Sequence, residues 1–172
     1  MTLKAHEVLC DCKRLLDDLN KEPQSDLWRL RWAGLVALLR AVGHVLKEVD
    51  AEVSPEAEGV INSAWEELKS RKPEPEILWE FIEGERNNIL KTYAFGPRIN
   101  ITVRPGPFWV NLVTGESGNL PSGPTTFEHF MHLGAFKGKD PLELCREAIA
   151  FWEKYLADID RRIAERRSRT AA

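Results

Sequence analysis

The chain has 172 residues, of which 43% are apolar and 30% are charged, so it can build one folded domain over residues 1–172 and is not a disordered chain. Its formal net charge of −3 argues against a protein that coats nucleic acid by bulk positive charge. The cysteines show no framework spacing, the first residues lack the apolar run of a signal peptide, and no stretch approaches the ~20 charge-free apolar residues of a membrane span. We therefore expect a cytoplasmic protein without membrane contact.

Helical periodicity covers most of the first half of the chain. Apolar residues recur at helical spacing over residues 2–20, 54–70 and 77–93, and each stretch predicts a helix with one buried face. Another helix, capped by Ser25 or Asp26, is predicted to run to about residue 49. It is apolar over most of its circumference, so we expect it to be the central and most buried helix.

One narrow strip of this central helix is polar. Its members recur along one side of the helix: Arg29, Arg40, His44 and Lys47. A solvated edge is one interpretation, because charged strips usually face water. The other is an anion-binding site, in which Arg40 and His44, four residues apart, present neighbouring donors. The pattern leaves both interpretations open.

The helix predicted over 77–93 carries charges where a core helix should be apolar. Glu85 falls in the middle of its apolar arc, with Arg86 and Asn88 close to the same arc. A buried charge is costly unless it is paired and hydrogen-bonded. Arg31 is likewise surrounded by leucines on the central helix. We therefore predict that Glu85 pairs with Arg31, or with Arg40 as second choice, in a structural polar network that includes Asn88.

Residues 96–139 have a different pattern and predict an arm inserted before the last helix. Apolar and polar residues alternate over 99–103, turn residues follow, and 109–114 is predicted as the returning strand. Residues 126–133 are predicted as a short helical turn. An isolated hairpin is marginal in water, so its apolar face should pack on the helices or on a second subunit. The residues on that face are Ile99, Ile101 and Val103.

The last helix has a strong start signal, a cap at Asp140 followed by Pro141 at the first helical position. It continues as a helical stripe into an arginine-rich end. The predicted fold class is mainly α, an antiparallel bundle of about five helices with an inserted β-hairpin arm. The bundle is expected from residues 1–95 and 140–168, and the arm from residues 96–139.

The sequence shows no cofactor or metal motif. His129 and His132 are three residues apart, but no third ligand lies near them in the sequence. Nothing matches a phosphate-binding loop, a dinucleotide fingerprint or a nucleophile elbow. We expect no metal and no cofactor.

The segment Glu85-Arg86-Asn87-Asn88 resembles the start of the HEPN signature, an arginine followed by four to six residues and then a histidine. In that superfamily of helical ribonucleases and RNA-associated proteins, the arginine and histidine face each other across a dimer and cleave RNA without a metal. Here the histidine positions hold Lys91, Thr92 or Tyr93. The chain as a whole, through LLRAVGHVL, WEFIEGERNNIL and GPTTFEHF, resembles a bacterial protein family of unassigned function.

Two hypotheses follow from these patterns. In the first, the protein is an HEPN-like module that forms a homodimer and associates with RNA or with a protein partner. If it is an enzyme, the resemblance implies a metal-independent endoribonuclease in which Arg86 is a catalytic residue that stabilises the phosphate charge. His44, on the polar strip of the central helix, would be the catalytic acid or base. The phosphate-binding residues would be Arg29, Arg40 and Lys47.

In the second hypothesis, the protein is a non-catalytic structural or protein-interaction module. Glu85, Arg86 and Arg31 then form a buried network that sets the register of the helices. The first hypothesis requires Arg86 and His44 to share one concave surface that solvent reaches. Burial of the charged groups with every donor paired favours the second.

Overall fold

The computed structural model describes residues 2–23, 25–102, 106–119 and 126–170 and confirms the predicted mainly helical fold class with an inserted β arm. The helical elements in chain order are α1 (Leu3–Lys21), α2 (Trp28–Val45), the π-helical η1 (Leu46–Asp50), the 3-10 turn η2 (Ala51–Val53), α3 (Pro55–Ser70), the π-helical η3 (Ile77–Ile82), α4 (Glu83–Thr92) and α5 (Pro141–Thr170). The strands are β1 (Pro97–Thr102), β2 (Phe108–Val110), β3 (Ser117–Asn119) and β4 (Thr126–Met131).

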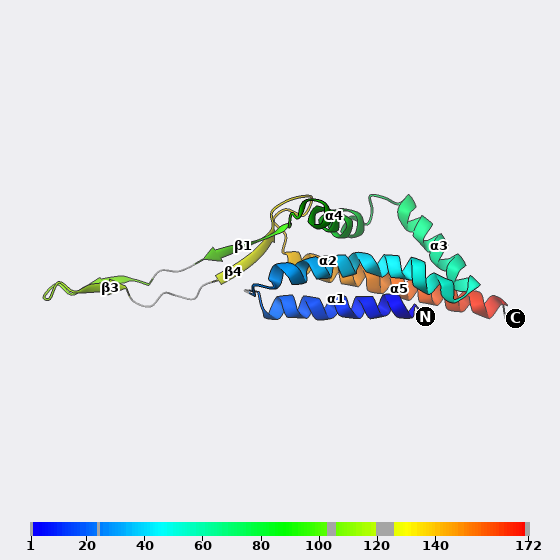
Figure 1. Ribbon diagram of the computed structural model, residues 1–172, viewed down its shortest axis with the longest axis horizontal. Coiled ribbons are helices and arrows are strands. Elements are labelled where there is room, and N and C mark those ends of the chain that lie inside the picture. The colour runs from blue at the N-terminus through cyan, green and yellow to red at the C-terminus, as the bar shows by residue number, and fades with distance from the viewer. Residues whose placement is uncertain (1, 24, 103–105, 120–125, 171–172) are drawn as a thin grey trace.

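Three long helices form the body of the molecule. Figure 1 shows α1, α2 and α5 side by side, with α1 running opposite to the other two, while α3 and α4 pack against them. Trp32 and Leu35 of α2 and Trp152 of α5 are fully buried between these helices. Burying one such side chain stabilises the fold by roughly 1.5–3 kcal/mol. α2 contacts α1, α4 and α5, but the prediction that it is the most buried helix is not confirmed, because Leu27 and Leu30 near its start are exposed and α5 contributes more buried residues to the core.

The helix predicted over 77–93 forms in two parts. Its first turns are the wider π-helical η3, and α4 completes it. The π-helical segment buries Ile77, Leu78, Phe81 and Ile82, and it packs on α5. Tyr93 ends the helix with a left-handed φ of 53°, which turns the chain toward the arm.

The start of α1 is held by acidic residues from other helices. The buried carboxylate of Asp50, at the end of η1, accepts hydrogen bonds from the backbone N–H groups of Lys4 at 3.1 Å and Ala5 at 2.9 Å. Asp160 of α5 accepts one from the N–H of Thr2 at 2.6 Å. The first N–H groups of a helix have no partner inside it, so these contacts satisfy them. These contacts also connect the start of α1 to η1 and to α5.

The arm has a different strand pairing from the prediction. β1 pairs antiparallel with β4, with Thr102 opposite Thr126, and the short strands β2 and β3 form a second ribbon. The predicted hairpin of 99–103 with 109–114 is therefore wrong, and so is the predicted helical turn at 126–133. Turn chemistry lies instead at Asn111, whose side chain accepts the N–H of Val113 at 2.9 Å, and at Gly115, with φ 75°.

The base of the arm packs on the helices and its outer part does not. Met131 of β4 and Phe136 after it are buried in the core. Ile99 and Ile101 remain 41% and 53% exposed, so the prediction that they face apolar surface within this chain is wrong. Val103 lies outside the described residues. Figure 1 shows the β2–β3 ribbon beyond the end of the bundle, away from the helices.

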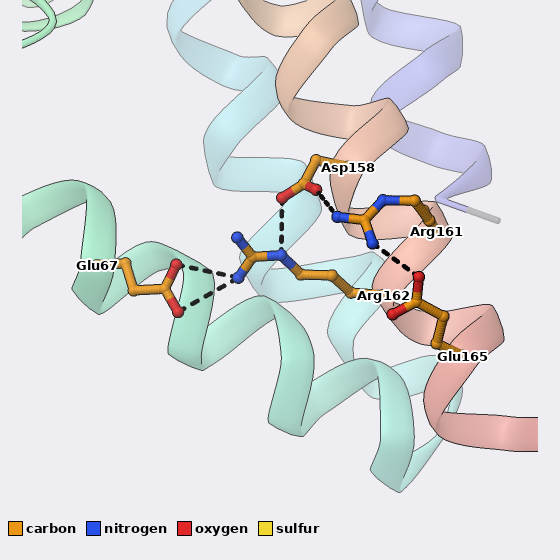
Figure 2. A network of polar contacts seen from close by, with 5 residues as sticks. All are labelled: Glu67, Asp158, Arg161, Arg162 and Glu165. Atoms are coloured by element: carbon orange, nitrogen blue, oxygen red, sulfur yellow. Dashed lines mark hydrogen bonds and ion pairs between the residues drawn. The ribbon is translucent and has the colours of Figure 1, made fainter. Parts of the chain in front are cut away.

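The arginine-rich end of α5 is engaged in ion pairs. Figure 2 shows Arg162 between Glu67 of α3, at 2.9 Å, and Asp158, at 2.7 Å. Arg161 pairs with Glu165 at 2.7 Å and also with Asp158. Exposed ion pairs contribute little stability, about 0–1 kcal/mol each. Their effect here is to position α3 on α5 and to neutralise much of the local positive charge.

Cys10 is exposed, whereas Cys12 and Cys145 are buried, and all of them are free thiols. Burial raises the pKa of Cys12 to about 12 and raises that of Cys145 well above its usual value. Buried thiols of this kind are poor nucleophiles because the thiolate is the reactive form.

Within the part of the chain that the structure describes, no helix is long and apolar enough to cross a membrane.

Candidate functional site

A groove between α2 and α4 brings together three of the predicted site residues. Arg40 and His44 line it from α2 and Arg86 lines it from α4, around a cavity of about 430 Å³. Ala37 and Ala41 are small, so the helix surface between the charged side chains is hollowed. His44 is exposed and Arg86 is half-buried. Arg86 and His44 therefore share one concave surface that solvent reaches, as the first hypothesis requires.

The charges in this groove are only loosely paired. Nε of Arg40 lies 3.8 Å from Oε1 of Glu83, and Nζ of Lys72 lies 3.8 Å from the other oxygen of the same carboxylate. Nη1 of Arg86 donates to Oδ1 of Asn87 at 3.0 Å. Good charge-assisted hydrogen bonds are about 2.7–2.9 Å long, so the Arg40–Glu83 contact leaves donor capacity for a ligand. Glu83 is the acidic group with which an anion would compete.

The other two predicted phosphate-binding residues lie outside the groove. Arg29 is at the far end of α2, roughly 16 Å from Arg40 at 1.5 Å per residue, and its guanidinium lies over the rings of Tyr93 at 5.5 Å and Phe95 at 5.6 Å. Lys47 follows in η1, where it lies 3.8 Å from Glu48. Arg29 and Lys47 therefore lie on either side of the groove, and Arg29 lines a different cavity.

Glu85 is buried as predicted, but its partners are not arginines. Its Oε1 atom accepts hydrogen bonds from Nε1 of Trp32 at 2.9 Å and from the N–H of Gly96 at 2.8 Å. The predicted pairing with Arg31 is wrong, because Arg31 pairs with Glu22 at 2.5 Å. The second choice, Arg40, is wrong as well. Neutral donors can satisfy a buried carboxylate when they are aimed at it, and this arrangement needs no buried cation.

The remaining members of the predicted buried network are not in the core. Asn88 is exposed, and it is its backbone carbonyl that accepts hydrogen bonds, from Thr92 and Ala94. Arg86 faces the groove and contacts Asn87. The predicted network of Glu85, Arg86 and Arg31 is therefore wrong in its partners. Whether the protein is a non-catalytic structural or interaction module stays a prediction.

Sequence reasoning missed an aromatic stack at the base of the arm. Trp32 and Trp28 of α2 are stacked with ring centroids 5.5 Å apart, and Trp28 is stacked on His129 of β4 at 4.4 Å. The only signal in the sequence was the four-residue spacing of the two tryptophans, because the contact with His129 depends on the fold of the arm. Burial lowers the pKa of His129, and the nearby charge of Asp140 opposes that shift.

The side chain of His132 has a hydrogen-bond partner within the chain. Nδ1 of His132 donates to the carbonyl of Gly96 at 2.6 Å, so this side chain connects the residue after β4 to the residue before β1 at the base of the arm. Across the described ranges, His, Cys, Asp and Glu side chains do not gather in any group of three that could hold a metal ion.

Comparisons of the chain with protein-family models, curated proteins and solved structures found no match.

Proposed function

We propose that this protein is a cytoplasmic, HEPN-like, nucleic-acid-associated module that binds single-stranded RNA in the groove between α2 and α4. The observation that carries the proposal is the meeting of Arg40, His44 and Arg86 along one open cavity. Arginine offers a planar fork of donors that matches a phosphate, and an imidazole can donate or accept a proton. Arg29 and Lys47 extend the same face, so a strand along α2 can place consecutive phosphates on it.

The groove also supports a candidate chemistry, which is metal-independent RNA cleavage. His44 would take the proton of a 2′-hydroxyl, whose oxygen then attacks the adjacent phosphorus to form a 2′,3′-cyclic phosphate. The bond from phosphorus to the 5′-oxygen of the next nucleotide breaks, and that oxygen takes a proton from the imidazolium of His44 or from water. Arg86 would stabilise the negative charge that develops on the phosphate oxygens. The HEPN resemblance at Arg86 supports this assignment. Cleavage of this kind is expected to continue in EDTA.

The test is a titration of labelled single-stranded RNA at low and high salt with wild type, Arg86→Ala and the double variant Arg40→Ala with Lys47→Ala. Three to five phosphate contacts predict that log affinity falls with log salt at a slope of about −2 to −3.5. Each variant should bind RNA of any sequence more weakly than wild type. The slope of log affinity against log salt should become less negative by about 0.7 for each phosphate contact that is lost. Arg14→Ala is the matched control, because Arg14 lies on α1 and pairs with Asp11.

Absence of RNA binding by the wild-type protein at low salt would overturn the proposal. Binding that neither groove variant weakens would place the RNA elsewhere on the molecule. Binding without cleavage would leave an RNA-associated protein that is not an enzyme. Melting curves of the variants must match wild type, so that loss of binding is not loss of fold.

The arm favours a second candidate function, which is self-association. Phe108 and Val110 of the outer ribbon are exposed, and Leu112 and Val113 at its turn are each 94% exposed. The ribbons are two-stranded, so each strand has an open edge, and two strands alone are marginally stable in water. We propose that the arms of two copies pair in a homodimer. The HEPN resemblance also implies a homodimer, although in that superfamily it is the motif arginine and histidine that face each other across it. The mass of the protein in solution, measured by light scattering, tests this assignment.

A further inference from the structure

A row of stacked rings leads from the core to the surface at the base of the arm. Trp32 is fully buried, and Trp28 and His129 are half-buried. The planes of Trp28 and Trp32 differ by 6°, and those of Trp28 and His129 by 11°. His129 is the outermost ring, and it lines cavities of about 370 Å³ and about 620 Å³. The stack therefore ends at a planar surface that a ligand can reach.

The smaller of these cavities, which we name the arm-base pocket, combines rings with positive charge. Its lining includes Trp28, Phe95 and His129 together with two arginines, Arg29 and Arg98. Arg29 is held over the ring of Phe95 at 5.6 Å, so its guanidinium is already oriented. Pockets of roughly 300–1,000 Å³ with mostly apolar walls and a few polar groups are typical of small-molecule sites.

These features select a particular class of ligand. A planar heteroaromatic ring can extend the stack or lie against its rim, because base–aromatic stacking needs only a π face. The arginines favour a negative group attached to that ring and disfavour a cation. Asp26, which also lines the pocket, can accept a hydrogen bond from an exocyclic amino group or a ribose hydroxyl.

We propose that the arm-base pocket binds a nucleobase that carries a phosphate. The base stacks on His129 at the outer end of the row, and the phosphate meets Arg29 and Arg98. This chemistry is shared by a free mononucleotide and by one unstacked residue of single-stranded RNA. The pocket and the groove between α2 and α4 have no lining residue in common, so the inference does not depend on RNA binding in that groove, although Arg29 also belongs to the polar strip of α2.

The test is calorimetric titration of the full chain with AMP, with ribose 5-phosphate, with adenosine and with a short single-stranded oligonucleotide. AMP should bind roughly tenfold or more tightly than ribose 5-phosphate, because only AMP offers a base to stack. It should also bind more tightly than adenosine, which has no phosphate for the arginines. If AMP does not bind but the oligonucleotide binds and loses affinity on His129→Ala, the source of the base is RNA.

Variants separate stacking from the fold. His129→Ala removes the outer ring and should weaken AMP binding roughly tenfold, whereas His129→Phe keeps a ring and should stay close to wild type. Arg98→Ala should weaken AMP and leave adenosine unchanged. Arg86→Ala, in the groove, and Arg14→Ala, on α1, should leave AMP binding unchanged. The His129→Phe variant keeps the test valid if the alanine variant does not fold.

Two results overturn the inference. One is that neither AMP nor the oligonucleotide binds wild type, or that each binds with an affinity that His129→Ala does not change. The other is binding of ribose 5-phosphate as tight as that of AMP, which would remove the base from the interaction. Loss of RNA binding in Arg86→Ala with unchanged AMP binding would show that the groove and the pocket act separately.

Discussion

Glu85 is the residue whose surroundings depend most closely on the fold. It is 4% exposed, and both of its hydrogen bonds end on the same oxygen. One donor is on α2 and the other begins the arm, so a single carboxylate joins two segments to α4. The backbone at Gly96 approaches so closely that an added Cβ would lie 2.5 Å from Oε2 of Glu85 and 2.5 Å from Cε of Met131. Only glycine fits at this position without movement of its neighbours.

Replacing Glu85 with alanine should destabilise the fold by roughly 2–5 kcal/mol, because it leaves the Trp32 N–H and the Gly96 N–H buried without a partner. Glu85→Gln keeps an oxygen at the same place and should cost less than half as much. Urea denaturation with Glu80→Gln, at an exposed carboxylate of η3, as the surface control measures both values. Equal losses for the alanine and glutamine variants would show that the hydrogen bonds to this oxygen are not what matters.

At the scale of elements, the start of α1 depends on a side chain from another segment. Asp50 accepts two backbone N–H groups of α1 while it is itself buried, which is the work that an N-cap residue usually performs from within its own helix. The positive end of the helix dipole lies at the same place and favours a carboxylate. The contact fixes where α1 sits relative to the end of η1.

Replacing Asp50 with alanine should cost roughly 2–4 kcal/mol, because two helix N–H groups lose their acceptor in a buried site. Asp50→Asn keeps one good acceptor and should recover part of this loss. Asp17→Asn, an exposed carboxylate on α1, is the control and should leave the melting temperature unchanged. A melting temperature of Asp50→Ala equal to that of wild type would contradict the capping role.

At the scale of the whole molecule, the bundle and the outer arm are separable. The buried apolar residues come from the helices and from the base of the arm, with Met131 and Phe136 as the arm's contribution. The outer ribbon adds exposed apolar side chains and no buried ones among the described residues. The bundle should therefore fold without it.

A variant that omits residues 103–125 and links Thr102 to Thr126 by a two-residue Asn-Gly turn tests whether the bundle folds without the outer arm. Thr102 and Thr126 are register partners, so a two-residue turn of this type can connect them. Its melting temperature should stay within a few degrees of wild type, because the core is unchanged. If the arms form the dimer, this variant should be a monomer in solution, whereas wild type should be a dimer. A variant that does not fold would show that the outer arm supports the bundle.

Local chemistry determined the helices of this protein. Apolar residues at helical spacing predicted α1, α3 and the buried face of α2, and the Asp140-Pro141 start predicted α5 within a residue. In the structure Oδ1 of Asp140 accepts the N–H of Leu142 at 2.7 Å. These features were readable because a helix is specified by neighbours within four residues along the chain. The burial of Glu85 was readable for the same reason.

Partners that are distant in sequence were decided by the tertiary structure alone. Glu85 and Trp32 are separated by 53 positions, and residue types alone do not select an indole N–H over the cation that we predicted. β1 pairs with β4 and not with the nearer segment 109–114 that was predicted as its partner. The groove at Arg40 and Arg86 and the stack at His129 exist because α4 and the arm pack against α2. Periodicity states which face of an element is buried, and only packing decides what that face meets.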